Sequence, residues 1–293
     1  MIDAVITYVN GDDPLWKQDY EAHAGAPILS KRFRDWGTLP YLFRGIEKNL
    51  PFIGKVFLVV SRDSQVPGWI NRETVNVVYH KDFIPEEYLP TFNPSVIEMF
   101  LHRIPGLGEQ YLYFNDDEFP VRPVKESSLF HGGKPAKQMG WHLNAVSPFL
   151  DLCKNSSDLA LKAARKKAGP FFLRPQLSVT PMLRSACEEA FKACESEILK
   201  SLTPVRGSGN FNQYFFSDYM YLKKLAVSRR ISHRQFSMAI SSADDIVHFL
   251  EKPSADFVCI NDMDMPLNRY MFSKERIQDG FNYLFNVRSS YEI

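Results

Sequence analysis

Short apolar runs alternate with longer amphipathic segments along much of this chain. The short runs are rich in β-branched and aromatic residues, which is typical of buried strands, and they cover residues 2–9, 56–61, 75–79, 111–114 and 257–260. Apolar positions recur at helical spacing in residues 41–50, 95–104, 185–202, 212–225 and 275–285. Strands that alternate with helices predict an α/β fold with a mostly parallel sheet flanked by helices.

This alternation weakens between about residues 120 and 225. We interpret that segment as a helical insertion or lid within a single catalytic α/β domain spanning residues 1–293. It contains a basic run at residues 162–167. Such a run is usually a solvated helix face, and the alternative is that it guides an anionic acceptor or a lipid-linked glycan.

The apolar run that begins at Tyr111 ends abruptly on Asn115, Asp116 and Asp117. Two adjacent carboxylates are costly to bury unpaired, so we expect them in the crevice outside the strand ends, where open α/β sheets bind ligands. Their oxygens suit Mg²⁺ or Mn²⁺ beside a nucleotide diphosphate, which makes Asp116 and Asp117 the candidate metal ligands. An Asx turn that merely ends a strand explains the stretch equally well when it is taken alone.

Polar residues follow other expected strands as well. Asn10, Gly11 and Asp12 come after the first strand, and Asn261 with Asp262 after the last. A glycine lets the backbone approach a ligand closely, and a carboxylate can bond sugar hydroxyls. A plain turn is locally as good an explanation.

Two arginines are candidates for a diphosphate clamp, because guanidinium forks match phosphate oxygens. They are Arg34 and Arg44, and for Arg44 alone a surface position on a solvated helix face is the better interpretation. His80 ends the third expected strand and can act as a base or hold a phosphate.

The helix expected before the carboxylate strand begins with Asn93 as its N-cap. Glu98 and His102 are four residues apart and are expected to share a face. His102 and Arg103, together with Asn93, are then placed to line the same crevice as the carboxylates. A histidine in such a position is more often part of the structure than of the catalytic machinery.

The overall composition bears on the class of ligand and on the cellular location. A net charge of +1 gives no indication of nucleic-acid binding, and the four cysteines lack metal-ligand spacing. The amino terminus lacks the basic flank of a signal peptide, and no apolar run approaches a membrane span. We therefore expect a cytoplasmic protein, with peripheral contact to the plasma membrane left open.

Taken in order, these motifs resemble the four conserved regions of the Stealth family of sugar-phosphate transferases. The first region resembles residues 2–16, and the second runs from Arg32-Phe-Arg-Asp35 through Leu89-Pro-Thr-Phe-Asn93 to Tyr113-Phe-Asn-Asp-Asp117. The third resembles residues 180–206, and the fourth resembles Cys259-Ile-Asn-Asp262 with the closing residues 290–292.

The resemblance implies a GT-A-like, Rossmann-like core and a definite reaction. A sugar-1-phosphate would move from a nucleotide sugar, such as a UDP-hexose or a UDP-N-acetylhexosamine, to a hydroxyl of a glycan or lipid-linked oligosaccharide. The product would be a phosphodiester in a capsule or cell-surface polysaccharide. An ordinary metal-dependent glycosyltransferase and a catalytically impaired binding protein are the alternatives.

The same resemblance leads to a set of expected roles. The residues expected to act in catalysis are Asp116, Asp117, His102, Arg103 and Arg206. The residues expected to bind substrate are Asn10, Gly11, Asp12, Arg34, Asp35, Arg44, His80, Asn93, Asn115, Asn261 and Asp262. Mg²⁺ or Mn²⁺ is the expected cofactor.

One departure from the family pattern concerns the proton of the acceptor hydroxyl. The third region usually opens with a histidine that is a plausible general base, whereas residues 176–181 of this chain contain none. Either His142 or a carboxylate near the metal takes this role, or the activity is altered or lost.

Overall fold

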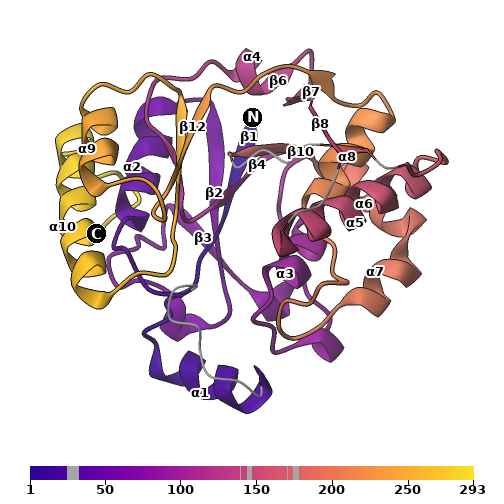
Figure 1. Ribbon diagram of the computed structural model, residues 1–293, viewed down its shortest axis with the longest axis horizontal. Coiled ribbons are helices and arrows are strands. Elements are labelled where there is room, and N and C mark those ends of the chain that lie inside the picture. The colour runs from indigo at the N-terminus through magenta and orange to yellow at the C-terminus, as the bar shows by residue number, and fades with distance from the viewer. Residues whose placement is uncertain (25–32, 139, 144–146, 170, 174–177) are drawn as a thin grey trace.

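The computed structural model describes residues 1–24, 33–138, 140–143, 147–169, 171–173 and 178–293. A five-stranded sheet runs through its centre, in the order β10, β4, β1, β2, β3 (Figure 1). The strands are β1 (Ile2–Thr7), β2 (Ile53–Val60), β3 (Val75–Tyr79), β4 (Gln110–Asn115) and β10 (Thr180–Leu183). Four of them are parallel and β10 is antiparallel, so the expected α/β fold with a mostly parallel sheet is confirmed.

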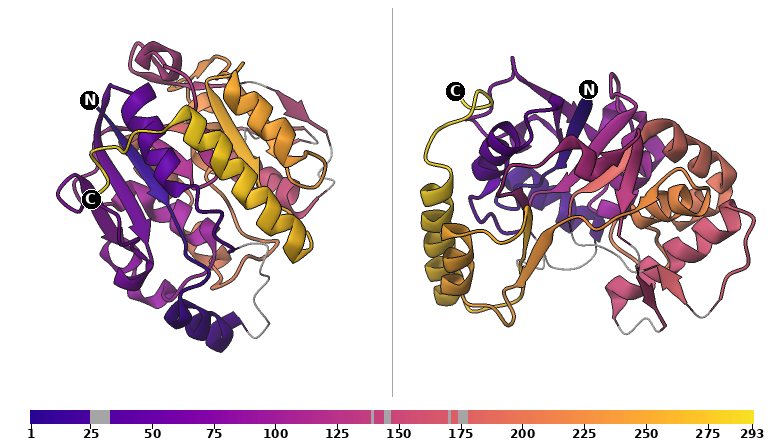
Figure 2. Two further views of the ribbon diagram at one scale, coloured as in Figure 1. Left: turned by 90° about the vertical axis from the view of Figure 1, so that its left-hand side faces the viewer. Right: turned by 90° about the horizontal axis from the view of Figure 1, so that it is seen from above.

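Alternation along β1 shows how this sheet is buried on both faces. Ala4 and Ile6 point into one apolar cluster and Val5 into the other, as the period of two along a strand requires. The first cluster is covered by α2 (Leu39–Asn49), α9 (Ala243–Glu251) and α10 (Leu267–Leu284). Figure 2 shows α9 and α10 side by side on the outside of this layer.

The opposite face of the sheet is covered by another group of helices (Figure 1). They are α3 (Pro94–Phe100), α5 (Pro148–Ala163), α6 (Arg184–Ala193), α7 (Glu195–Ser201) and α8 (Tyr214–Leu222). α1 (Pro14–Ala24) packs through Trp16 and Tyr20 against Phe92, apart from both main clusters. None of the helices in the described ranges has both the length and the apolar composition needed to cross a bilayer.

A smaller sheet joins the central one at the Asp116–Asp117 turn. It contains β12 (His233–Ser237), β13 (Phe257–Asn261) and β5 (Glu118–Pro120). Because β5 begins directly after this turn and pairs antiparallel with β13, Cys259 lies opposite Glu118, and the Ile260 amide donates to the Asp117 carbonyl at 3.0 Å. This register brings the end of β13, Asn261, beside the end of β4, Asn115, although the two residues are 146 positions apart in the chain.

Several predicted boundaries change in the structure. The strand expected at residues 75–79 is confirmed at those bounds, and Asn93 is confirmed as an N-cap, since its Oδ1 accepts from the Ser95 amide at 3.0 Å. The single helix expected at residues 185–202 is wrong, because the chain breaks at Cys194 into α6 and α7. The helix expected at residues 95–104 ends at Phe100 and continues as a 3-10 turn, Leu101–Arg103.

The segment from about residue 120 to 225 is largely helical, but part of it belongs to the core. β10 pairs with β4 and forms an edge of the central sheet, so that strand is not part of an appended lid. The remaining short elements are α4 (Glu126–Leu129), β6 (Phe130–His131), β7 (Lys134–Lys137), β8 (Trp141–His142), β9 (Phe172–Leu173) and β11 (Val227–Ser228). The basic run begins at Lys162 in the last turn of α5 and continues beyond the helix, where Lys166 and Lys167 are exposed.

Candidate functional site

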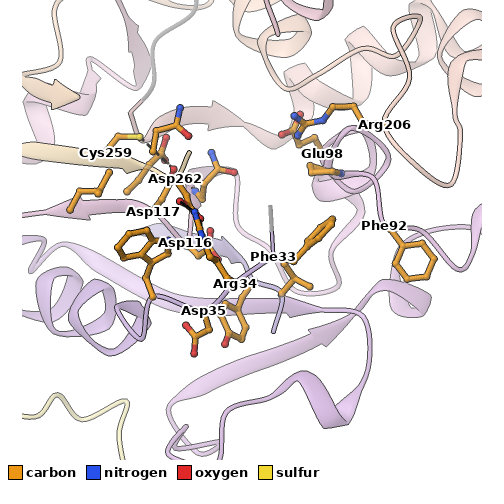
Figure 3. Close-up of a pocket in the computed structure, with 18 of the residues that line it drawn as sticks. Phe33, Arg34, Asp35, Phe92, Glu98, Asp116, Asp117, Arg206, Cys259 and Asp262 are labelled. Carbon is orange, nitrogen blue, oxygen red and sulfur yellow. Dashed lines mark hydrogen bonds and ion pairs between the residues drawn. The ribbon is translucent and has the colours of Figure 1, made fainter. Parts of the chain in front are cut away.

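A cavity of about 580 Å³ opens at the carboxyl ends of β1, β4 and β13 (Figure 3). Its charged lining combines six acidic and two basic side chains: Asp35, Glu98, Asp116, Asp117, Glu118, Asp262, Arg34 and Arg206. Aromatic rings form much of the rest of the wall: Tyr8, Tyr20, Phe33, Trp36, Phe92, Phe119, Phe149 and Tyr214. The position agrees with the rule that open α/β sheets bind ligands beyond their carboxyl strand ends.

Asp116 and Asp117 lie where β4 leaves the central sheet and turns into β5. Burial raises the pKa of Asp116 to about 8, and the nearby charges of Asp117 and Asp35 add to the rise. Burial likewise raises the pKa of Asp117 to about 6. Neither carboxylate forms an ion pair with a cationic side chain in the described part of the chain. The turn therefore brings together two carboxyl groups that no cationic side chain of the described residues compensates.

Arg34 reaches the same cavity but is already paired. Its Nε donates to Asp262 Oδ2 at 2.7 Å, and its Nη2 donates to Asp262 Oδ1 at 2.7 Å. The guanidinium also lies over the ring of Tyr270, with its carbon 4.7 Å from the ring centroid. The structure thus places the predicted clamp arginine and the predicted Asp262 together, as a two-pronged ion pair on the cavity wall.

Glu98 occupies another side of the cavity, next to Arg206 (Figure 3). Only 8% of Glu98 is exposed, and its Oε2 accepts from the Gln213 amide at the start of α8 at 2.7 Å. Burial raises the pKa of Glu98 to about 7, although the Gln213 amide and the positive charge of Arg206 act in the opposite direction. A carboxyl group with a pKa near neutrality is suited to accept and return a proton.

Cys259 also lies in this wall, and its thiol donates to Asp117 Oδ2 at 3.6 Å. The contact follows from the pairing of β13 with β5, which fixes the position of Cys259 relative to the turn. The thiol is buried, so its role here is to orient the carboxylate.

The donor set of the turn fits a hard divalent cation. Mg²⁺ keeps several water ligands and is usually held by one or two carboxylates together with substrate phosphates. The described residues contain no group of three or more His, Cys, Asp or Glu side chains arranged to enclose a metal. Two uncompensated carboxylates at an open cavity match an incomplete site of that kind, which a diphosphate would complete.

Tyr8 and Val9, directly after β1, line the cavity, but Asn10, Gly11 and Asp12 do not, contrary to what the sequence suggested. The Asn10 amide donates to Gln65 Oε1 at 2.6 Å, and Asn10 Oδ1 accepts from the Asp12 amide at 2.9 Å. A Cβ added at Gly11 would collide with the carbonyl oxygen of Phe33. The glycine therefore allows the close approach of the Phe33 backbone, and not of a ligand as expected. Asp12 pairs with Lys17 on the surface.

Arg44 is also absent from the cavity. Its Nε and Nη2 donate to the two carboxylate oxygens of Glu292 at 2.9 and 2.7 Å, and its Nη1 donates to the Phe285 carbonyl at 3.0 Å. These bonds tie α2 to the end of the chain. The expectation of a diphosphate clamp at Arg44 is wrong in position, because all three guanidinium nitrogens are committed to that tie.

Of the residues in and around the helix before β4, Glu98 lines the cavity, whereas Asn93 and His102 are buried elsewhere. Asn93 is fully buried and donates to the Thr203 carbonyl, so it braces two loops and does not face the cavity. His102 is buried against Phe191 and Phe216, with its Nε2 3.2 Å from Glu188. The expected shared face of Glu98 and His102 is lost because the α-helix gives way to a 3-10 turn at Leu101.

Arg103 packs over the Phe191 ring, with its guanidinium carbon 4.6 Å from the centroid, and lies outside the cavity. His80 lies in a different cavity from the carboxylates. His142 stacks on Phe172, with ring centroids 5.4 Å apart, and does not line the site. Gln176, where the third region departs from the family pattern, lies outside the described residues.

The predicted residues that meet around one cavity are Arg34, Asp35, Asn115, Asp116, Asp117, Arg206, Asn261 and Asp262. The sequence interpretation missed Glu98 as a cavity residue and did not consider Glu118 or Cys259. Glu118 directly follows the paired aspartates, so its place in the chain was a usable signal. Nothing in the local pattern separates Glu98 from an ordinary helix glutamate.

The amino-acid sequence is similar to that of known bacterial proteins. Residues 32–138 match the family described as Stealth protein CR2, conserved region 2. Receptor polysaccharide phosphotransferase WefC of Streptococcus oralis is 43% identical over 138 residues, which cover 44% of this chain and 41% of that protein. The matched stretch thus spans less than half of such streptococcal relatives.

Longer matches come from two other bacteria. Capsular polysaccharide phosphotransferase fcs1 of Haemophilus influenzae is 33% identical over 248 residues, covering 77% of this chain and 67% of that protein. A capsular polysaccharide phosphotransferase of Actinobacillus suis is 32% identical over 321 residues, covering 99% of this chain and 82% of that protein. On the strength of this match and of the conserved region, the chain belongs to the Stealth protein family.

Proposed function

We propose that this chain transfers a sugar-1-phosphate from a nucleotide sugar to a glycan hydroxyl during the synthesis of a capsule or another surface polysaccharide. The observation that carries the proposal is the pair of half-buried carboxylates, Asp116 and Asp117, at the carboxyl ends of the strands, where no cationic side chain of the described residues pairs with them. The relatives named above as polysaccharide phosphotransferases support the same reaction class. A nucleotide-sugar donor would place the reaction in the cytoplasm.

Asp116 and Asp117 would hold Mg²⁺ or Mn²⁺, which would neutralise the phosphate oxygens of the donor. Phosphoryl transfer depends on positioning and charge neutralisation more than on covalent help from the protein. Arg206 lines the cavity beside Glu98 and carries the positive charge suited to stabilise the remaining negative charge.

Glu98 is suited to take the proton that the acceptor hydroxyl must lose. The acceptor oxygen would form a bond to the phosphorus that carries the sugar, while the bond from that phosphorus to the bridging oxygen breaks. The nucleoside monophosphate leaves, and the proton moves to the Glu98 carboxylate. With a pKa of about 7, Glu98 offers the proton acceptor that the missing third-region histidine would otherwise supply.

The products distinguish this proposal from its rivals. ³¹P NMR and mass spectrometry would follow UDP-, GDP- and CDP-sugars incubated with the protein, Mg²⁺ or Mn²⁺ and a glycan acceptor. A sugar phosphodiester with nucleoside monophosphate supports the proposal. A glycoside with nucleoside diphosphate identifies an ordinary glycosyltransferase, and nucleotide-sugar binding without any product identifies a binding protein.

A further inference from the structure

A second cavity, of about 520 Å³, lies beside the first, and the two share Phe92 in their walls. Its other lining residues include Trp16, Ser61, Arg62, His80 and Thr91. None of these residues lines the carboxylate cavity. Phe92 lies on the Glu98 side of the carboxylate cavity, away from Asp117 and Asp262 (Figure 3).

Two polar side chains that line this second cavity have no hydrogen-bond partner among the described residues. The Ser61 hydroxyl is enclosed yet forms no hydrogen bond with any described residue. The His80 side chain is only 7% exposed, and its ring likewise forms no hydrogen bond within the described part of the chain. Enclosed polar groups are almost always hydrogen-bonded, so unpaired ones beside a cavity are available to a ligand or to water that fills it.

The charges around the cavity define the kind of ligand. Burial lowers the pKa of His80 to about 4, so the neutral ring offers one donor and one acceptor. Arg62 is paired with Asp19, while Lys81 and Glu86 bring opposite charges to the lining. This mixture does not concentrate positive charge as an anion site does. Neutral hydrogen-bonding groups beside the aromatic rings of Trp16 and Phe92 match the hydroxyls and apolar faces of a sugar.

We propose that the second cavity binds the sugar units of the acceptor glycan that follow the reacting one. The inference rests on the proposed transferase function and adds the location of the acceptor chain. The reacting sugar would lie near Glu98, and the next units would pass Phe92 toward Ser61 and His80. The enzyme would accordingly favour an oligosaccharide acceptor over a monosaccharide.

The Ser61→Ala variant separates binding from folding. Because the hydroxyl has no partner among the described residues, its removal should leave the melting temperature unchanged or raise it. His80→Leu removes both ring nitrogens at similar size. Ser64→Ala is the matched control, because Ser64 Oγ donates to Asp13 Oδ2 at 2.6 Å, outside the cavity. This control should lower the melting temperature and leave acceptor binding as it was.

The probe is a ladder from monosaccharide to tetrasaccharide, prepared by partial hydrolysis of the surface polysaccharide of the producing cell. Saturation-transfer NMR measures its binding to the full chain without a donor, and the transfer assay measures KM for each length. The affinity of the unaltered protein should rise with length. Ser61→Ala and His80→Leu should each weaken the longer acceptors about fivefold and leave the monosaccharide unaffected.

A length effect that is absent in the unaltered protein, or that survives in both variants, would overturn the proposal. NMR binding needs no turnover, so its result stands apart from the reaction itself. Loss of the length effect without detectable transfer would support the second cavity and count against the proposed function. Transfer with no length effect would do the reverse.

Discussion

Two groups of charged side chains in this molecule differ in whether a neighbouring opposite charge compensates them. Arg44 and Glu292 lie between α2 and the end of the chain, and their two-pronged contact compensates both charges. Burial opposes ionisation of Glu292, yet the hydrogen bonds from Arg44 and Ser289 hold its pKa below the ordinary value. Asp116 and Asp117 are half-buried, no cationic side chain among the described residues pairs with them, and their pKa values rise.

The difference separates charges that stabilise the fold from charges that remain available to a bound cation. A compensated pair lowers the cost of burial and holds two elements together. Carboxylates left uncompensated at a cavity keep a free-energy penalty that a bound cation would remove. The same contrast separates the expected clamp residue Arg44, which is structural, from the carboxylates that we assign to the reaction.

The Asp116→Asn substitution gives the largest expected effect. It keeps the shape of the side chain and removes the charge that would hold the metal, so turnover should fall at least about a thousandfold. The melting temperature should stay the same or rise, because a poorly compensated buried carboxylate is lost. Steady-state assays and thermal unfolding check both statements. Normal turnover in this variant would contradict the assignment of Asp116 as a metal ligand.

Addition of Mn²⁺ extends that test to binding. The ion should raise the melting temperature of the unaltered protein in proportion to the logarithm of its concentration, because it binds the folded state. Asp116→Asn should abolish this rise. Arg44→Met serves as the control, since it leaves the carboxylate turn intact and should keep the response to Mn²⁺.

Glu98→Gln should reduce turnover by about a hundredfold, as expected for the loss of a general base. The unaltered enzyme should gain activity as the pH rises through about 7, where Glu98 becomes ionised, and the variant should lack this rise. A pH–rate profile that keeps the same rise in the variant assigns the proton transfer to another group.

The same ionisation has a consequence for stability. Folding raises the pKa of Glu98 from the ordinary 4.5 to about 7, so the folded state holds the proton more tightly than the unfolded chain. The contribution of Glu98 to stability is therefore complete below pH 4.5 and declines as the pH rises to about 7. Denaturant unfolding at several pH values should show that decline in the unaltered protein and its absence in Glu98→Gln.

On the structural side of the comparison, Arg44→Met should lower the free energy of unfolding by about 3 kcal/mol, because Glu292 is left buried and unpaired. Turnover measured well below the melting temperature should be close to that of the unaltered protein. A large loss of turnover without loss of stability would place Arg44 in the reaction after all.

Cys259 gives the smallest expected effect. Removal of its thiol in Cys259→Ala releases one oxygen of Asp117 and should lower turnover about threefold to tenfold through poorer positioning. Cys259→Ser supplies a hydroxyl donor at the same place and should recover most of the loss. Equal losses in both variants would mean that the hydrogen bond to Asp117 does not matter.

The sequence determined what depends on neighbours in the chain. Its apolar runs were enough to predict the four parallel strands of the central sheet, though not β10, and Asn93 before Pro94 was enough to predict a helix start. The acidic residues after Phe114 lie, as expected, in a crevice at the carboxyl ends of the strands. These features follow from backbone periodicity, capping and the cost of burying charge, which act over a few residues.

Only the tertiary structure decided how distant charges combine. The register of β5 against β13 brings Asp262 to the aspartate turn, and the change to a 3-10 turn at Leu101 turns Glu98 to the cavity and His102 to the core. The pairing of Arg44 with Glu292 joins residues 248 positions apart. Which charges pair depends on which side chains the fold brings close together. The local order of residues does not show these pairings.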